Sequence, residues 1–204
     1  MAAFWRLTKQ AARRAAAVFS PMVLLLLSAA MVAVLIVSGS VLGHEVYVYN
    51  AIVMGLLALF VAFAALGQKT DAARVLWLTA LSAVLKGVSA MLLSPENARY
   101  SSVYFGGVAI GYLLARGALM YVPRELQTTE YAGTADLHPY AITVHFTGIL
   151  WMTGFTLSPT FFGDDLLLHF GAEKFAYETF FIGSAFVLNA LALMRSYVKL
   201  AFAK

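Results

Sequence analysis

Six long apolar stretches constrain the fold of this chain more than any other feature of its sequence. Each has about the 20 residues that a helix needs to cross the hydrocarbon core of a bilayer. None shows the alternation of apolar and polar residues that a membrane β-barrel requires. The sequence therefore predicts an all-α fold, a polytopic membrane helix bundle of about six transmembrane helices. The predicted helices cover residues 21–42, 47–67, 73–93, 102–122, 139–158 and 176–200.

The composition agrees with a bilayer as the solvent. Of the 204 residues, 62% are hydrophobic and only 12% are charged, whereas about a quarter of the residues of a soluble domain are charged. So little charge leaves too little polar surface to cover a water-soluble globule. The chain has no cysteine, which excludes disulfides, thiolate metal sites and a cysteine nucleophile. We expect the lipid bilayer as the main partner, and no nucleic acid.

Turn residues set the expected limits of two predicted helices. Ser20 is suited to cap the first helix, and Pro21 to occupy its first position. The fifth helix is expected to begin at Pro139 and to end at the Ser158–Pro159 pair. The residues between this pair and residue 176 then form a loop outside the membrane, which carries Asp164, Asp165 and Glu173.

The distribution of lysine and arginine predicts the topology. If the N-terminus lies inside, the inside segments contain ten of the 14 cations and the outside loops contain only Arg99 and Lys174. Because inside loops carry an excess of Lys and Arg, both termini are expected on the cytoplasmic or matrix side, in a bacterial plasma membrane or a mitochondrial inner membrane. The inside cations are Arg6, Lys9, Arg13, Arg14, Lys69, Arg74, Arg124, Arg195, Lys199 and Lys204.

Residues 1–20 are expected to form an amphipathic helix in the membrane interface, followed by the transmembrane domain at 21–204. Phe4 and Leu7 lie on one face of this helix, and the opposite face is basic. Such a helix is drawn to anionic lipid, so a structural anionic lipid is expected and no cofactor is predicted. The composition also resembles a mitochondrial targeting segment. The expected lipid contacts are Arg6, Lys9, Arg13 and Arg14.

Two charged residues near the outer ends of predicted helices are candidates for a functional pair. A charge inside a membrane helix costs roughly 2.5–3.5 kcal/mol on insertion scales and marks a functional site by default. Lys86 lies about 10 Å below the outer end of the third helix, and Glu178 about 3–4 Å below the outer end of the sixth. They can pair if these helices touch. Alternatively, Lys86 extends to the outer interface and Glu178 is an interfacial carboxylate.

Arg116 is the other charged residue within a predicted helix, about 9 Å from its inner end. No acidic residue is predicted at this depth, and arginine stays protonated. The alternatives are a phosphate of the inner leaflet, an anion of a partner subunit or bound ligand, and a role in ion translocation. With two cations and at most one anion in the predicted core, the isolated chain does not balance its own charge.

His145 is the histidine expected deep in the membrane. Two histidines that hold one haem must lie on facing helices, whereas His138 and His145 lie on one predicted helix and share a face at different levels. The sequence contains no HExxH or carboxylate–histidine metal spacing. We therefore expect a packed, hydrogen-bonded His145, with a haem shared with a second chain as the alternative. No metal ligand and no catalytic residue is predicted.

Gly107 and Gly111 form a GxxxG step on the fourth predicted helix, and Ala115 continues the stripe of small residues. Such a stripe lets another helix approach closely. Both a helix of this chain and a helix of a partner satisfy the pattern, so helix packing is the role predicted for both glycines.

Three classes of function remain. The first is a non-catalytic subunit of a larger energy-transducing complex of the respiratory, ATP synthase or photosynthetic type, because no catalytic constellation is found and the intramembrane charge is unbalanced. The second is a transporter or channel for a small solute or an ion such as the proton, although neither repeats nor broken helices are predicted. The third is an enzyme acting on lipid or quinone. We expect the first, with other membrane subunits as partners and no catalytic site of its own. The enzyme would use the inner-end residues Arg116, Arg124, Asp136, His138 and His145.

Overall fold

The computed structural model describes residues 44–93, 98–156 and 158–203. The chain divides into two compact units, residues 1–42 and 43–204, and every described helix belongs to the second. The segments predicted at 1–20 and 21–42 lie outside the described residues.

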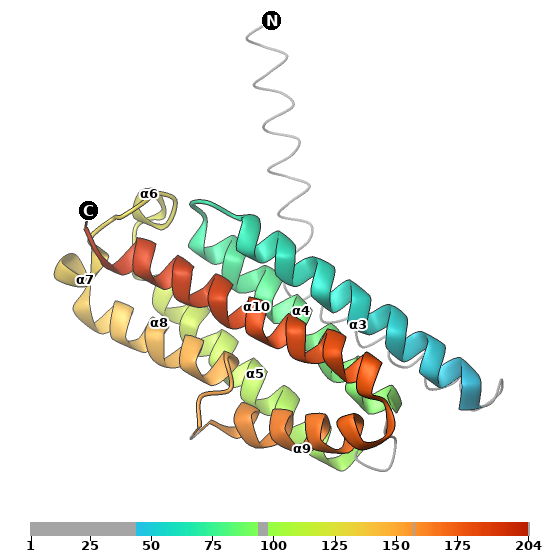
Figure 1. The fold of residues 1–204 in the computed structure, drawn as a ribbon. Coiled ribbons are helices and arrows are strands. Elements are labelled where there is room, and N and C mark those ends of the chain that lie inside the picture. Colours follow the sequence, from blue (N-terminus) through green and yellow to red (C-terminus); the bar gives the residue numbers. More distant parts are fainter. Residues whose placement is uncertain (1–43, 94–97, 157, 204) are drawn as a thin grey trace, which may run out of the picture. The chain divides into compact units, whose positions relative to one another are not determined.

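Eight α-helices make up the described part of the second unit (Figure 1). The same residues contain no β-strand, and one isolated bridge joins Ala132 to Ala203. The fold is therefore all-α. The helices are α3 (His44–Gly67), α4 (Ala72–Leu93), α5 (Ala98–Leu119), α6 (Arg124–Gln127), α7 (Thr134–Leu137), α8 (Pro139–Met152), α9 (Pro159–Lys174) and α10 (Ala176–Ala201).

Within the described ranges, four helices are long and apolar enough to cross a membrane. Four such helices are consistent with an integral membrane protein. α4 and α10 begin and end within one residue of the stretches predicted at 73–93 and 176–200. The four apolar spans are Tyr47–Gly67, Ala72–Leu93, Ser101–Leu119 and Thr179–Ala201.

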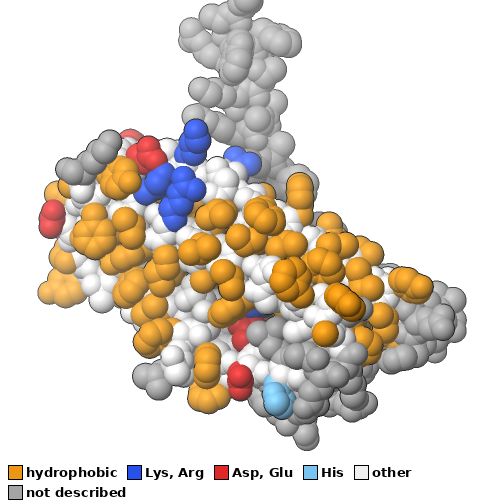
Figure 2. Space-filling model, viewed as in Figure 1, with side chains coloured by type: hydrophobic (Ala, Val, Ile, Leu, Met, Phe, Trp, Pro, Cys, Tyr) orange, Lys and Arg blue, Asp and Glu red, His pale blue; other side chains and the backbone are white. Residues whose placement is uncertain are grey.

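The unit exposes apolar side chains and buries polar ones. Phe60 and Leu113 are 72% and 67% exposed, whereas Ser82 and Lys86 on α4 are 0% and 3% exposed. Figure 2 shows hydrophobic side chains over a broad band of one face. A water-soluble monomer rarely exposes so large an apolar surface, whereas lipid tails match it.

α4 is the central helix. It packs against α3, α5 and α10, and 67% of its span is buried, against 28% to 39% for the other three spans. The charged residue Lys86 lies on this helix, seven residues from its end at Leu93 and therefore about 10 Å along the axis from that end. The central position of α4 explains why Lys86 is enclosed on all sides by protein.

Two helices replace the single helix predicted at 139–158 and the outer loop predicted after it. α8 ends at Met152, and α9 begins at Pro159 and continues to Lys174. α8 has 14 residues, a length of about 21 Å that is too short to cross the hydrocarbon core. The chain therefore contains a broken helix, which the sequence pattern did not predict.

Local chemistry at the break explains both helix ends. Gly154 adopts φ +64°, and the N–H of Phe155 donates to the carbonyl of Leu150 at 3.0 Å. A left-handed glycine followed by this bond is the Schellman pattern that ends a helix. Ser158 then accepts a bond at 3.2 Å from the N–H of Phe161, so it caps α9, and Pro159 occupies the first helical position.

α8 and α9 lie one after the other along α5. A Cβ added to Gly148 of α8 would lie 2.5 Å from the backbone N of Ala115, and one added to Gly107 of α5 would lie 2.6 Å from the backbone N of Thr160 in α9. Residue numbers rise along α8 and α9 while they fall along α5, so the broken helix runs antiparallel to α5. The glycines permit this close approach because they carry no Cβ.

One end of the unit is basic, and it is called the basic end here. Lys69, Arg195 and Lys199 lie there, together with Arg124. Arg195 Nη1 donates to the carbonyl of Leu66 at 3.0 Å, and Lys199 Nζ donates to the carbonyl of Lys69 at 3.1 Å. Cations near the last carbonyls of a helix are favourable, so these two side chains stabilise the C-terminal end of α3.

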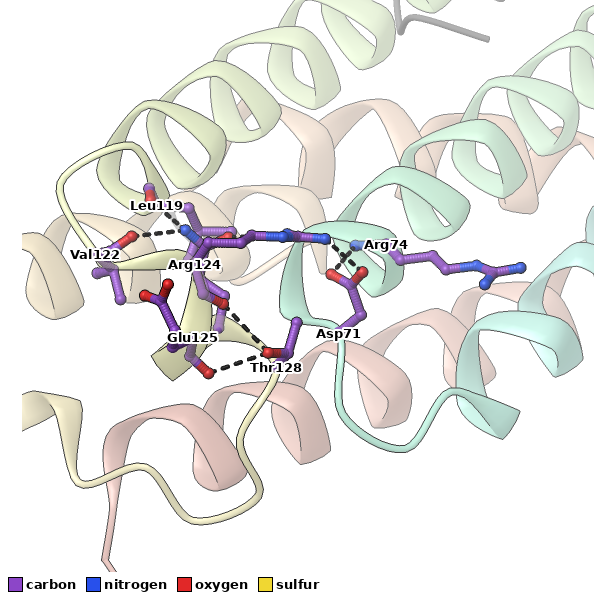
Figure 3. A network of polar contacts seen from close by, with 8 residues as sticks. Asp71, Arg74, Leu119, Val122, Arg124, Glu125 and Thr128 are labelled. Atoms are coloured by element: carbon purple, nitrogen blue, oxygen red, sulfur yellow. Dashed lines mark hydrogen bonds and ion pairs between the residues drawn. The ribbon is translucent and has the colours of Figure 1, made fainter. Parts of the chain in front are cut away.

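A polar network at the basic end joins α4 to α6 (Figure 3). Arg124 Nη2 donates to Asp71 Oδ2 at 2.7 Å, and Asp71 Oδ1 accepts a bond at 3.1 Å from the N–H of Arg74. Gln127 Nε2 donates to the carbonyls of Leu119 and Val122, both at 2.7 Å. The network therefore connects the start of α4 and the end of α5 through α6.

Candidate functional site

The strongest candidate site is an ion pair buried between α4 and α9. Lys86 Nζ lies 2.6 Å from Asp164 Oδ1. The two side chains are 4% and 7% exposed. An ionised pair that is removed from water loses its hydration, and only excellent geometry and further hydrogen bonds repay this loss. Such a pair inside a membrane bundle is a functional candidate by default.

Aromatic rings from two other helices surround the ammonium group of Lys86. Its Nζ lies 5.0 Å from the ring centroid of Tyr104 in α5 and 4.6 Å from that of Phe186 in α10. Both distances are within the range of a cation–π interaction. The hydroxyl of Tyr104 donates to the carbonyl of Ala83 at 2.8 Å. Four helices therefore meet at the pair: α4, α5, α9 and α10.

The helix break positions the carboxylate. Because Ser158 and Pro159 begin a new helix, Asp164 lies in the second turn of α9 and points toward α4. A Cβ added to Gly154, within the break, would lie 3.3 Å from Asp164 Oδ2. The carboxylate is therefore next to irregular backbone, the arrangement found at the substrate and ion sites of many secondary transporters.

Three buried polar atoms near the middle of the bundle have no hydrogen-bond partner among the described residues. They are Asp164 Oδ2, Thr160 Oγ1 and Asn189 Oδ1. Asp164 and Thr160 are four residues apart and lie on the same face of α9. A buried polar atom without a partner requires an explanation, such as a water, an ion or a catalytic role. The site therefore has free hydrogen-bonding capacity around its carboxylate.

A second polar contact lies one helical turn from Lys86. Asn189 Nδ2 of α10 donates to Ser82 Oγ of α4 at 3.0 Å, and Ser82 Oγ donates to the carbonyl of Ala58 in α3 at 2.7 Å. On the other side of Lys86, Ser89 Oγ donates to the carbonyl of Ala51 at 2.7 Å. Polar side chains thus follow one face of α4 at helical spacing.

The acid that Lys86 contacts is not the one proposed from the sequence. The sequence placed Asp164 in an outer loop and offered Glu178 as the partner of Lys86. In the structure, Asp164 belongs to α9 and its residue is 5% exposed. Glu178 lies in the first turn of α10, and its side chain is outside the described part of the molecule. An isolated Lys86 that extends to the interface is excluded by the 2.6 Å contact.

Arg116 lies in the last turn of α5 and is half-buried. No carboxylate of the described residues forms an ion pair with it. The structure therefore does not bring Arg116 to the Lys86–Asp164 site.

His145 is a packed histidine at the contact of α8 with α5. The residue is 2% exposed, and its Nδ1–H donates to the carbonyl of Ala115 at 2.9 Å. The other inner-end candidates do not converge on it, since Asp136 is exposed and Arg124 pairs with Asp71. Among the residues that can be placed, no three His, Asp or Glu side chains are arranged to hold a metal ion.

The helix that approaches the GxxxG step belongs to this chain. Gly107 faces Thr160 of α9, and a Cβ added to Gly111 would lie 2.9 Å from the carbonyl oxygen of Gly148 in α8. The expected lipid contacts Arg6, Lys9, Arg13 and Arg14 lie outside the described residues.

Sequence reasoning missed Asp164, Ser82 and Asn189 as parts of one site. The signal for Asp164 is the Ser158–Pro159 pair, which has the same N-cap and first-position chemistry as Ser20–Pro21 and begins α9 instead of ending the preceding helix. No family model, no curated protein and no solved structure matches this chain.

Proposed function

We propose that this chain is an integral membrane protein that translocates a small ion and that Lys86 and Asp164 carry the charge. The observation that supports this proposal is the state of the carboxylate. Asp164 Oδ1 pairs with Lys86 at 2.6 Å, while Oδ2 is buried without a partner. A purely structural ion pair is more stable when every lone pair is satisfied, whereas a carboxylate that exchanges an ion needs a free oxygen.

The proposed topology keeps six crossings, with α8 and α9 together as the fifth. The first crossing would be the apolar stretch at 21–42, and α3, α4, α5 and α10 would supply the others. The basic end would face the cytoplasm or the matrix, because Lys and Arg accumulate on that side. In this arrangement Lys86 and Asp164 lie within the membrane, and the helix break lies beside them.

The test is ion flux in liposomes that contain the purified full-length chain, measured separately for protons, sodium and potassium. The decisive variant is Lys86→Met/Asp164→Leu, which removes both charges and leaves an apolar core. Apolar replacement of a buried pair is often neutral or stabilising, so we expect normal helix content and at least tenfold lower flux.

Asp165→Asn is the matched control, because it removes an exposed carboxylate one residue away. Its flux should equal that of the wild-type chain. Wild-type flux in the double variant would overturn the proposal. So would the absence of flux from wild-type protein, tested both alone and with any partners that co-purify.

A second, compatible proposal is that the chain works as a subunit of a larger energy-transducing complex. It rests on Arg116, a half-buried cation in a helix of membrane-spanning length that has no carboxylate partner among the described residues. An anion on a neighbouring subunit would supply the missing charge, and an anionic lipid is the competing source.

Native electrophoresis of mild-detergent extracts tests this subunit role. Arg116→Ala should reduce co-migration with partner proteins at unchanged helix content. Migration of the wild-type chain by itself, or normal assembly of the variant, would reject the role.

A further inference from the structure

We infer that the translocated ion is a proton and that it reaches Asp164 from the basic end, along a polar column between α4 and α10. The column consists of Thr79, Ser82 and Asn189. This inference rests on the proposed function. It adds the identity of the ion, the side from which the ion enters, and Ser82 and Asn189 as positioning residues.

The column begins at a pocket in the basic end. Its lining includes Lys69, Asp71, Lys199, Val75 and Ala192. Val75 belongs to α4 and Ala192 to α10. The pocket is therefore lined by both of these helices, which pack against each other.

The next turn of each helix beyond the pocket is polar. Four residues after Val75 comes Thr79, and three residues before Ala192 comes Asn189. Asn189 Nδ2 donates to Ser82 Oγ at 3.0 Å, which joins the two helices by side chains at this level. Residues at these spacings lie on the same face of a helix. From Val75 to Lys86 the column covers about 16 Å of helix axis.

Two oxygen atoms, one in the column and one at its end, have no hydrogen-bond partner within the described part of the chain and could therefore bind the waters that a proton path needs. Asn189 Oδ1 is a buried acceptor with no partner among the described residues, and Asp164 Oδ2 is another. Each can accept a bond from an ordered water, which is the usual occupant of such a position. Waters at these two oxygens would extend the column from the pocket to the carboxylate.

A proton fits the pair better than a metal ion does. The ammonium group of Lys86 already occupies Asp164 Oδ1 at 2.6 Å, so a metal ion bound there would lie next to a fixed positive charge. A proton that binds Oδ2 needs no further ligand. Among the side chains that the structure describes, Tyr104 of α5 is the other titratable group that faces the pair, and its hydroxyl donates to the carbonyl of Ala83.

The charge balance of the step is simple. A proton added to Asp164 Oδ2 converts the carboxylate into a neutral acid, and the pair changes from a net charge of zero to +1. Loss of one proton, from the acid or from the ammonium group of Lys86, returns the pair to zero. No electron is transferred, and no other bond is formed or broken.

The two serines that flank Lys86 on α4 provide a matched comparison. Ser82 and Ser89 both bury their hydroxyls and both donate to an α3 carbonyl at 2.7 Å. Ser82 alone also accepts the bond from Asn189, and it lies on the side of Lys86 that faces the basic end. The inference therefore predicts that the same serine-to-alanine change lowers proton flux at Ser82 but not at Ser89.

Proton flux in liposomes is the first measurement, made with a pH-sensitive dye under a clamped membrane potential. Asn189→Leu replaces the amide by an apolar group of similar branched shape and should lower proton flux at least tenfold. Ser82→Ala should lower it severalfold, and Ser89→Ala should stay within twofold of wild type. Normal flux in Asn189→Leu, combined with loss of flux in Lys86→Met/Asp164→Leu, would overturn the column while leaving ion translocation intact. Flux of sodium or potassium without protons would overturn the identity of the ion.

Cysteine labelling is the second measurement, and it does not depend on flux. The natural chain has no cysteine, so single changes report one position each. A small thiol reagent added at the basic end should modify Ser82→Cys at least tenfold faster than Ser89→Cys, because thiolates form in contact with water. Equal rates, or no reaction at either position, would overturn the proposed side of entry.

Discussion

Two ion pairs of nearly equal length lie in opposite surroundings in this protein. Lys86 and Asp164 approach to 2.6 Å with side chains 4% and 7% exposed, whereas Arg124 and Asp71 approach to 2.7 Å with side chains 57% and 26% exposed. The distance between the charged atoms therefore does not tell which pair matters more to stability. Removal of one partner leaves an uncompensated buried charge in the first pair and a hydrated ion in the second.

The largest expected effect is that of Lys86→Met as a single change. It leaves Asp164 as an unpaired buried carboxylate, so the free energy of unfolding should fall by about 3–5 kcal/mol. Unfolding of the purified protein in detergent, followed by circular dichroism, measures this change. The double variant Lys86→Met/Asp164→Leu should regain most of the loss. If the single change cost less than about 1 kcal/mol, the pair would be energetically equivalent to a surface pair.

The next largest effect is expected from a change that displaces α9, the helix that carries Asp164 of the buried pair. Gly107→Ala introduces a Cβ that would lie 2.3 Å from Thr160 Oγ1 and 2.6 Å from its backbone N. α9 must then move away from α5, at a cost of about 1–3 kcal/mol, and the ion pair is displaced with it. Thermal unfolding in detergent is the measurement.

Gly106→Ala is the matched control for this change. A Cβ at Gly106 meets no atom within 4 Å, and alanine is the better helix former by up to about 1 kcal/mol. The control should therefore be neutral or stabilising. Equal destabilisation by both variants would contradict the close approach of α9 to α5.

The smallest effect is expected at the exposed pair. Arg124→Ala should change the free energy of unfolding by no more than about 1 kcal/mol. Added salt should reduce the difference further, because screening acts strongly on exposed charges. Unfolding of the variant and the wild-type protein at low and high salt tests both points. A loss as large as that of Lys86→Met would remove the contrast between the exposed pair, drawn in Figure 3, and the buried one.

The long uniform helices could be predicted because each is a continuous apolar run. The stretch predicted at 73–93 corresponds to α4, Ala72–Leu93. The same run predicts Lys86 as a site candidate, because a lysine inside a continuous apolar helix needs a partner. A count of apolar residues is therefore sufficient for helices that are apolar along their whole length, even where, as in α4, most of the helix is buried.

The broken helix could not be predicted in this way. α9 contains Asp164, Asp165, His169, Glu173 and two glycines within 16 residues, a composition that resembles a loop. Its Asp164 is compatible with a helix because a lysine distant in sequence neutralises it, and a local count does not contain that information. The Ser158–Pro159 pair gave the relevant signal, but the same chemistry can follow one helix or begin another.

The separation of Lys86 and Asp164 in the sequence also affects how the protein is made. The two residues are 78 positions apart, and a ribosome that adds about 5–20 residues per second needs about 4–16 s to cover that distance. During this interval α4 carries a lysine without its final partner, at an insertion cost of roughly 2.5–3.5 kcal/mol. The nascent hairpin of α3 and α4 therefore carries this cost until α9 emerges, and the synthesis of Asp164 is the point at which Lys86 can gain its partner in the bundle.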